Sequence, residues 1–139
     1  MKIKFDNTLC VLCHTCEFVC PANAICIESS NEQSALYTFT LWHNSCTLCG
    51  NCTYYCPSGA LMLSHEENAI NTQEHKYTHA IHANVSLTTC SSCGETMLAL
   101  PHTFLAKAFG STSASLEEHF RLCPTCRRTH TFSQRVLNP

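Results

Sequence analysis

The sequence has 139 residues, of which 13 are cysteine, and a formal net charge of -2 at pH 7. A chain of this length forms one domain, or two small domains when bound metal replaces part of the hydrophobic core. The near-neutral charge gives no support for nucleic-acid binding. No segment of the sequence approaches the roughly 20 apolar residues that a membrane span needs.

The cysteines are expected to be reduced rather than paired in disulfides. Their number is odd, and most of them stand in C-x-x-C pairs, a spacing typical of metal sites. The opening MKIKFDNTLC contains no apolar run like the core of a signal peptide. The sequence therefore predicts a chain of the reducing cytoplasm, where clustered cysteines bind metal. A disulfide scaffold is the alternative for a short chain so rich in cysteine.

Charged residues are scarce, at 13% of the sequence against about 25% in an average soluble domain. A small protein has much surface for its volume and normally covers it with charge. Coverage by partner proteins would explain the deficit. A neutral surface of Ser, Thr and Asn is the alternative.

The first half of the chain is a duplication. CVLCHTCEFVCP (residues 10–21) and CTLCGNCTYYCP (residues 46–57) have the same spacing, each cysteine of the second run lying 36 residues after its counterpart. One supersecondary unit has therefore been doubled. Period-two patterns predict a strand before and a strand after each run, forming two short hairpins. These strands are expected at residues 3–5, 24–28, 37–42 and 60–64.

The run C-x-x-C-x-x-C-x-x-x-C-P has a physical logic. Its first three cysteines are spaced so that a tight loop could wrap around one corner of a cubane-shaped iron-sulfur cluster, with a short helix after the loop. The proline after the fourth cysteine favours a turn from helix to strand. A zinc array is the alternative, but zinc sites seldom use a third cysteine at this spacing.

Two copies of this run in one chain resemble the dicluster ferredoxin family. The resemblance implies an α+β fold in which two short hairpins and two short helices surround two 4Fe-4S clusters. It also implies that each run gives its last cysteine to the other run's cluster. On this resemblance, cluster 1 is held by Cys10, Cys13, Cys16 and Cys56, and cluster 2 by Cys46, Cys49, Cys52 and Cys20.

Cys26 and His14 are the other residues of this half with ligand chemistry. Cys26 matches Met62 of the second repeat, an apolar strand position, and is expected to be a buried, inert thiol. His14 matches Gly50 and is expected to be a surface histidine; an imidazole beside cluster 1 is the alternative. The sequence contains no nucleophile with a neighbouring base and no glycine-rich phosphate loop, so we expect no active site of its own.

Residues 65–89 are expected to connect a ferredoxin domain (residues 1–64) to a second module with a C-terminal tail (residues 90–139). The connector is expected to end in a strand near NVSLTT. His75, His79 and His82 have the spacing of one helix face, which is a candidate metal site. The segment has little helical periodicity, so solvated histidines are the favoured interpretation.

The second module contains CSSC (residues 90–93) and CPTC (residues 123–126), with 29 residues between them. Two such knuckles predict one tetrahedral site of four thiolates, Cys90, Cys93, Cys123 and Cys126. Structural zinc is the favoured occupant. A single rubredoxin-like iron, a third iron-sulfur cluster and free thiols are the alternatives.

Two short helices are expected between the knuckles. The first covers residues 101–110, and the second begins at Ser115, which forms a capping-box pattern with Glu118. Residues 110–114 are expected to be a flexible turn. Helices this short do not persist alone, so the metal is expected to hold this α-rich module together.

A dicluster ferredoxin region followed by two spaced C-x-x-C pairs, the second within LCPTCRRTHTF, resembles the small iron-sulfur subunit of group 4 membrane-bound NiFe hydrogenases. That family includes the formate hydrogenlyase component related to the dicluster subunit of respiratory complex I. The resemblance implies an electron relay, in either direction, between an upstream donor and the NiFe site of neighbouring large and small subunits. The donor would be a ferredoxin or a formate dehydrogenase iron-sulfur subunit. The implied location is the cytoplasmic face of the inner membrane, without a transmembrane segment.

Two other functions remain as alternatives. A free-standing soluble ferredoxin, with a zinc module that docks on another redox enzyme, would normally use surface charge to steer encounter, and this sequence has little. A zinc-ribbon nucleic-acid binder is the third possibility. It would use Arg121, Arg127, Arg128 and Arg135, which are instead expected to offset the thiolates or to contact a protein partner.

Overall fold

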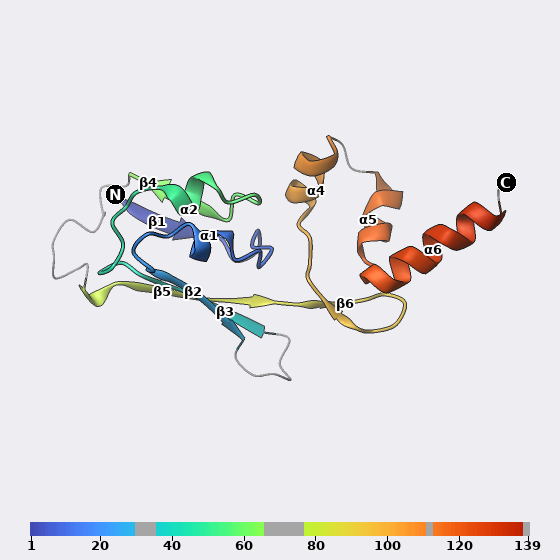
Figure 1. The fold of residues 1–139 in the computed structure, drawn as a ribbon, viewed down its shortest axis with the longest axis horizontal. Helices are drawn as coiled ribbons and strands as arrows, with labels where there is room; N and C mark the ends of the chain where they lie inside the picture. The colour runs from blue at the N-terminus through green and yellow to red at the C-terminus, as the bar shows by residue number, and fades with distance from the viewer. Residues whose placement is uncertain (30–35, 66–76, 111–112, 138–139) are drawn as a thin grey trace. The chain divides into compact units, whose positions relative to one another are not determined.

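The computed structural model describes residues 1–29, 36–65, 77–110 and 113–137, with side chains up to residue 131. The chain divides into two compact units, Met1–Ser86 and Leu87–Pro139. Figure 1 shows most of the strands in the first unit and the three longer helices in the second. None of the helices in the described ranges is long and apolar enough to cross a membrane.

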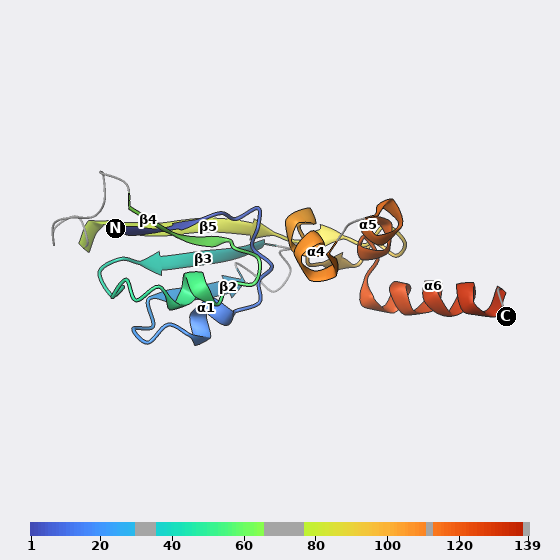
Figure 2. The same cartoon turned by 90° about the horizontal axis from the view of Figure 1, so that it is seen from above.

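The first unit contains two antiparallel sheets. One sheet consists of β1 and β4. In the other, β3 lies between β2 and β5, as Figure 2 shows. The strands are β1 (Lys2–Phe5), β2 (Ile25–Ser29), β3 (Leu36–Trp42), β4 (Leu61–Ser64) and β5 (Ala80–Ser86).

Each strand expected from the sequence has a counterpart here, but only one of the two pairs joins consecutive strands. β2 and β3 pair in that way, from Ile25 opposite Leu41 to Ser29 opposite Tyr37. β1 and β4, by contrast, enclose the whole duplicated region. Each pair thus joins one strand from each repeat. The two repeats are held together by backbone hydrogen bonds as well as by side-chain packing.

Part of the segment expected to be a connector is a strand of the first unit. β5 pairs with β3 along its whole length, from Leu36 opposite Ser86 to Trp42 opposite Ala80. Val85 of β5 is buried at 4% exposure. The first unit therefore continues to Ser86, beyond the boundary at residue 64 that the cysteine pattern suggested.

The core of the first unit contains both apolar side chains and cysteines. Phe39, Ile3 and Leu41 are at most 1% exposed, and the Phe5 ring stacks on Phe39 with 3.9 Å between centroids. Buried cysteines of the two runs pack in the same cluster. Since a fully buried apolar side chain contributes about 1.5–3 kcal/mol, this core gives the cysteine loops a stable support.

The second unit has a small core. Its buried cluster around the cysteines consists of Cys90, Met97 and Cys123. Two very short strands form a hairpin at the first knuckle, and three helices follow. These elements are β6 (Thr88–Thr89), β7 (Thr96–Met97), α4 (His102–Phe109), α5 (Ala114–Phe120) and α6 (Pro124–Leu137).

Two expectations for this unit were wrong in detail. The cap of α5 is Ser113, whose Oγ accepts a hydrogen bond from the Leu116 N–H at 3.3 Å, and Ser115 lies inside the first turn. Both serines are local capping candidates, and the structure uses the earlier one. The segment expected to be a tail is helix α6, which begins at Pro124. Proline suits the first turn of a helix because its missing N–H would have no partner there.

Candidate metal centres

The two cysteine loops repeat one unusual backbone. Left-handed conformations recur at positions 36 residues apart, and they include residues that are not glycine. Such conformations cost about 1–2 kcal/mol for a residue with a Cβ. Their repetition therefore indicates that both loops are shaped to bind the same kind of ligand. The matched φ values are 47° at Leu12 and 56° at Leu48, 58° at His14 and 79° at Gly50, and 47° at Asn23 and 72° at Gly59.

The first group of cysteines crosses between the repeats. Three members come from the first run, and the fourth comes from the end of the second. They line a single small cavity whose other walls include Phe5, Ile27 and Leu61. The members of this group are Cys10, Cys13, Cys16 and Cys56.

The thiols of this group are poorly suited to carry charge without a cation. Burial, together with the neighbouring thiolates, raises the pKa of Cys16 to about 12. Burial also raises the pKa of Cys10. Burial opposes ionisation of Cys56 too, but hydrogen bonds from Ser58 and from backbone N–H groups lower its pKa overall. Since a bound cation stabilises thiolates, this donor set fits iron.

The second group has the opposite composition, with three cysteines from the second run and one from the first. Burial, together with the nearby thiols of Cys46, Cys20 and Cys49, raises the pKa of Cys52 to about 11. Cys20 of the first run therefore faces three cysteines of the second. Cys20 Sγ accepts a hydrogen bond from the Ala24 N–H at 3.3 Å, and Cys46 Sγ accepts one from the Leu48 N–H at 3.4 Å. Backbone N–H groups thus point at two sulfurs of this group.

The short helices α1 (Thr15–Phe18) and α2 (Asn51–Tyr54) carry one buried cysteine each, Cys16 and Cys52. Asn51 Nδ2 donates to the Val19 carbonyl at 3.5 Å and so joins α2 to the end of α1. Phe18 and Tyr54 occupy matched positions of the two repeats and are 88% and 82% exposed. An exposed aromatic pair thus lies on the helices that carry the buried cysteines.

Cys26 differs from its expected environment, whereas His14 does not. Cys26 is partly exposed rather than buried, and its Sγ donates to Glu28 Oε1 at 3.2 Å. That hydrogen bond is the main cause of its raised pKa. His14 lines the cavity of the first cysteine group, with Nδ1 2.9 Å from Glu17 Oε2. Its side chain is 37% exposed, in keeping with the surface position expected for it.

The histidine trio does not share a helix face. His75 lies outside the described residues, His79 precedes β5, and His82 lies on β5 with Nδ1 3.2 Å from Thr40 Oγ1. The His79 ring instead meets the ring of His43 edge-on, with 4.7 Å between centroids. His43 is 2% exposed, and neither ring nitrogen has a hydrogen-bond partner among the described residues. No pattern in the sequence marks this histidine as buried.

The four C-terminal cysteines converge on one point. The Sγ atoms of Cys90, Cys93, Cys123 and Cys126 all lie within 4.8 Å of one another, and those of Cys93 and Cys123 are 3.7 Å apart. A tetrahedral zinc site with Zn–S bonds of about 2.3 Å requires sulfurs about 3.8 Å apart. The geometry fits a single ion, and the sulfurs are too close together to surround a cubane.

Backbone N–H groups support these thiolates. The Cys123 N–H donates to Cys90 Sγ at 3.2 Å, and Gly94 takes a left-handed φ of 76° directly after the first knuckle. N–H groups of Cys93 and Cys123 lower the pKa of Cys90 to about 6. Hydrogen bonds with Cys123 and Cys93 raise the pKa of Cys126 to about 12. The thiols thus share protons, which a bound ion displaces.

Comparison with known families agrees with the geometry of the first unit. Residues 9–60 match the family model of the 4Fe-4S dicluster domain. The matched segment contains every cysteine of the two crossed groups. This part of the chain is therefore an iron-sulfur domain of the ferredoxin type. No curated protein matched the chain.

Proposed function

We propose that this protein is an electron-transfer subunit that relays electrons between two redox partners through two 4Fe-4S clusters. The main support for this proposal is the pair of cysteine groups, each with three members from one run and one from the other. Bound clusters supply one-electron chemistry at potentials between about -700 and +450 mV. The chain holds them in apolar walls and directs N–H groups at their ligands.

The partners we propose are a ferredoxin or a formate dehydrogenase module on one side and the NiFe site of a membrane-bound hydrogenase on the other. Support comes from the exposed aromatic face of α1 and α2, because Phe18 and Tyr54 have almost their whole side chains in water. Exposed apolar patches usually mark protein contacts. A free-standing soluble carrier would leave both rings uncovered, so we favour a subunit of a complex. The chain itself contributes no active site in this proposal.

Cluster content tests the first part of the proposal. Anaerobically purified protein is expected to contain about eight acid-labile sulfides per chain, four from each cubane. Sulfide is the better measure than iron, since iron can also occupy the C-terminal thiolates. The reduced protein should give the electron paramagnetic resonance spectrum of two interacting clusters. Four sulfides per chain and an isolated-cluster spectrum would contradict the proposal.

The aromatic face tests the second part. In a strain that makes the hydrogenase complex, we expect the pair Phe18→Ser and Tyr54→Ser to weaken co-purification with the NiFe subunits while sulfide content stays unchanged. Tyr77→Ser is the matched control, because Tyr77 is also largely exposed, at 69%, and is not on these helices. Unchanged co-purification of the double variant would show that this face does not bind the complex.

A further inference from the structure

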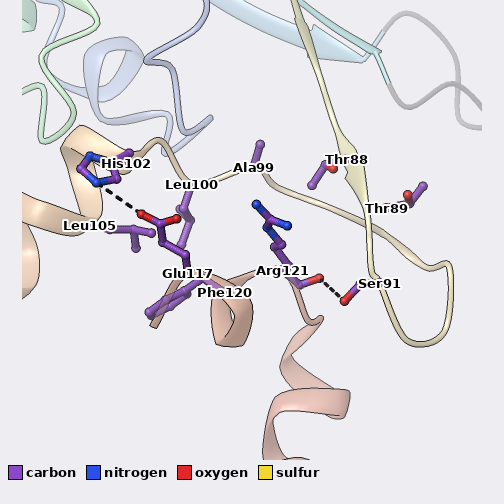
Figure 3. Close-up of a pocket in the computed structure, with 10 residues that line it drawn as sticks. All are labelled: Thr88, Thr89, Ser91, Ala99, Leu100, His102, Leu105, Glu117, Phe120 and Arg121. Carbon is purple, nitrogen blue, oxygen red and sulfur yellow. Dashed lines mark hydrogen bonds and ion pairs between the residues drawn. The ribbon is translucent and has the colours of Figure 1, made fainter. Parts of the chain in front are cut away.

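The second unit contains a pocket that the relay does not use. Its volume is about 330 Å³, within the range of roughly 300–1,000 Å³ of small-ligand sites. Leu100, Leu105 and Phe120 give it apolar walls, and hydroxyl side chains lie along the segment that enters the first knuckle (Figure 3). The remaining lining residues are Thr88, Thr89, Ser91, Ala99, His102, Glu117 and Arg121.

Arg121 brings an uncompensated charge to this pocket. Glu117 and Arg121 have the i, i+4 spacing that favours an ion pair on a helix. Glu117 Oε1 instead lies 3.3 Å from His102 Nε2. In Figure 3 the guanidinium is directed away from Glu117, toward Ala99 and Thr88. Within the described part of the chain, no hydrogen bond or ion pair to this guanidinium is formed.

The other two arginines with described side chains in this unit are engaged. Arg127 Nε donates to the Leu122 carbonyl at 2.8 Å, and its guanidinium lies 4.8 Å from the centre of the Phe120 ring. Arg128 Nε donates to the Pro124 carbonyl at 3.4 Å. Of these three arginines, Arg121 alone lines the pocket, and its guanidinium alone has no hydrogen bond or ring contact among the residues that the structure describes.

The metal site fixes the backbone that carries Arg121. Its carbonyl accepts hydrogen bonds from the Ser91 N–H at 3.1 Å and from Ser91 Oγ at 3.4 Å. Ser91 follows Cys90, whose Sγ accepts from the Cys123 N–H. Hydrogen bonds next to the four cysteines therefore join the two segments that carry Ser91 and Arg121.

We infer that this pocket binds a carboxylate at the end of an apolar group. The Arg121 guanidinium matches a carboxylate in a two-bond arrangement, and the apolar walls accept an aliphatic chain. A phosphate dianion fits less well, because a single cation would balance it beside the Glu117 carboxylate. The chemistry is shared by the C-terminus of a polypeptide that ends in an apolar residue and by a free aliphatic acid. This inference does not depend on the relay.

Titration of the full-length, metal-loaded protein tests the inference. The probes are N-acetyl-leucine, isocaproate and the uncharged N-acetyl-leucinamide, with binding followed by calorimetry and by nuclear magnetic resonance shifts. We expect a carboxylate probe to bind and the amide to bind roughly tenfold more weakly or worse, since a hydrogen bond to a charged group is lost. Tighter binding of N-acetyl-leucine than of isocaproate would identify a peptide end as the source; the reverse would identify a free acid.

Variants complete the test. Arg121→Gln is expected to weaken the carboxylate probes by roughly tenfold, with zinc content unchanged. Arg128→Gln removes the same charge from a residue outside the pocket and is expected to leave affinity unchanged. The inference is overturned if neither carboxylate binds at millimolar concentration or if the amide binds equally well. It is also overturned if Arg121→Gln and Arg128→Gln change the affinity for the carboxylate probes to the same extent. The amide comparison uses the unaltered chain, so it decides the matter even if Arg121→Gln fails to fold.

Discussion

Cys20 and Cys56 are the residues that connect the two repeats chemically. Each is attached to one cysteine run and faces the three cysteines of the other. Their sulfurs also receive local support, from the Ala24 N–H for Cys20 and from Ser58 for Cys56. Replacing either residue should therefore impair the cluster held by the three cysteines of the opposite repeat.

Cys20→Ser is expected to impair the cluster held with Cys46, Cys49 and Cys52. A serine hydroxyl is a poor substitute for a thiolate, and a cubane with three strong ligands is unstable. The sulfide content should fall from about eight toward four, and the remaining paramagnetic resonance signal should be that of the first cluster.

Cys26→Ser is the matched control for that experiment. Cys26 contacts Glu28 on β2 and belongs to neither crossed group, so its replacement should keep both clusters. Selective loss of the first cluster in Cys20→Ser would show that the crossed grouping is wrong.

His43 gives the first unit a sensitivity to acid. Its pKa is lowered, chiefly by burial and then by His79, and Lys2 acts in the same direction. The unfolded chain has a histidine pKa of about 6.5 and so takes up a proton that the folded unit resists. Stability should therefore fall as the pH drops through about 6.5, by about 1.4 kcal/mol for each unit of pKa depression.

His43→Phe is expected to reduce this pH dependence, because the ring remains and the titration is removed. Thermal unfolding of the anaerobic protein at pH 7.5 and 5.5 measures the effect as the difference between the two conditions. Comparing differences removes any constant packing penalty of the larger ring. An equal loss of thermal stability on acidification in the variant and the unaltered protein would mean that His43 does not cause the pH dependence.

At the scale of elements, the cysteine loops depend on backbone conformation. Gly50 caps α2 with φ 79°, and a Cβ added there would come no closer than 3.9 Å to Thr53 Oγ1. Space is thus available, and the cost of a side chain is conformational. The first repeat already accommodates His14 at this position, with φ 58°.

Gly50→Asn is therefore expected to be mild and Gly50→Val severe. Asparagine tolerates the left-handed region, whereas a β-branched residue does not. We expect Gly50→Asn to retain about eight sulfides per chain and Gly50→Val to lose part of the second cluster. Equal cluster content in the two variants would show that this backbone conformation is not needed for binding.

At the scale of the molecule, the two units have different sources of stability. The first unit has an apolar core that includes Phe39, Ile3 and Leu41. The cluster of buried residues at the second unit's knuckles consists of two cysteines and Met97. A core this small rarely holds a fold without a metal or disulfides. The second unit should therefore unfold when its ion is removed, and the first should not.

Cys123→Ser tests this difference. In zinc modules, binding supplies roughly 10–16 kcal/mol at neutral pH, so we expect residues 90–126 to lose their structure and hydrogenase assembly to fall. The spectra of both cubane clusters should persist in the isolated chain. Hydrogen exchange measures the first effect and paramagnetic resonance the second. Preserved helices in a metal-free variant would show that packing alone suffices.

The sequence by itself determined the features that depend on local spacing. The two cysteine runs of equal spacing, the strands around them and the paired knuckles follow from ligand count and from period-two alternation, which are properties of neighbouring residues. Spacing alone did not group the cysteines; the crossed grouping entered as an implication of a family resemblance.

The tertiary structure decided what depends on residues far apart in the chain. It paired β1 with β4, added β5 to β3, buried His43 beside His79 and directed Arg121 into a pocket. These outcomes depend on which surfaces meet. Packing across long sequence separations selects among local alternatives that are nearly equal in free energy, and no short stretch of sequence contains that information.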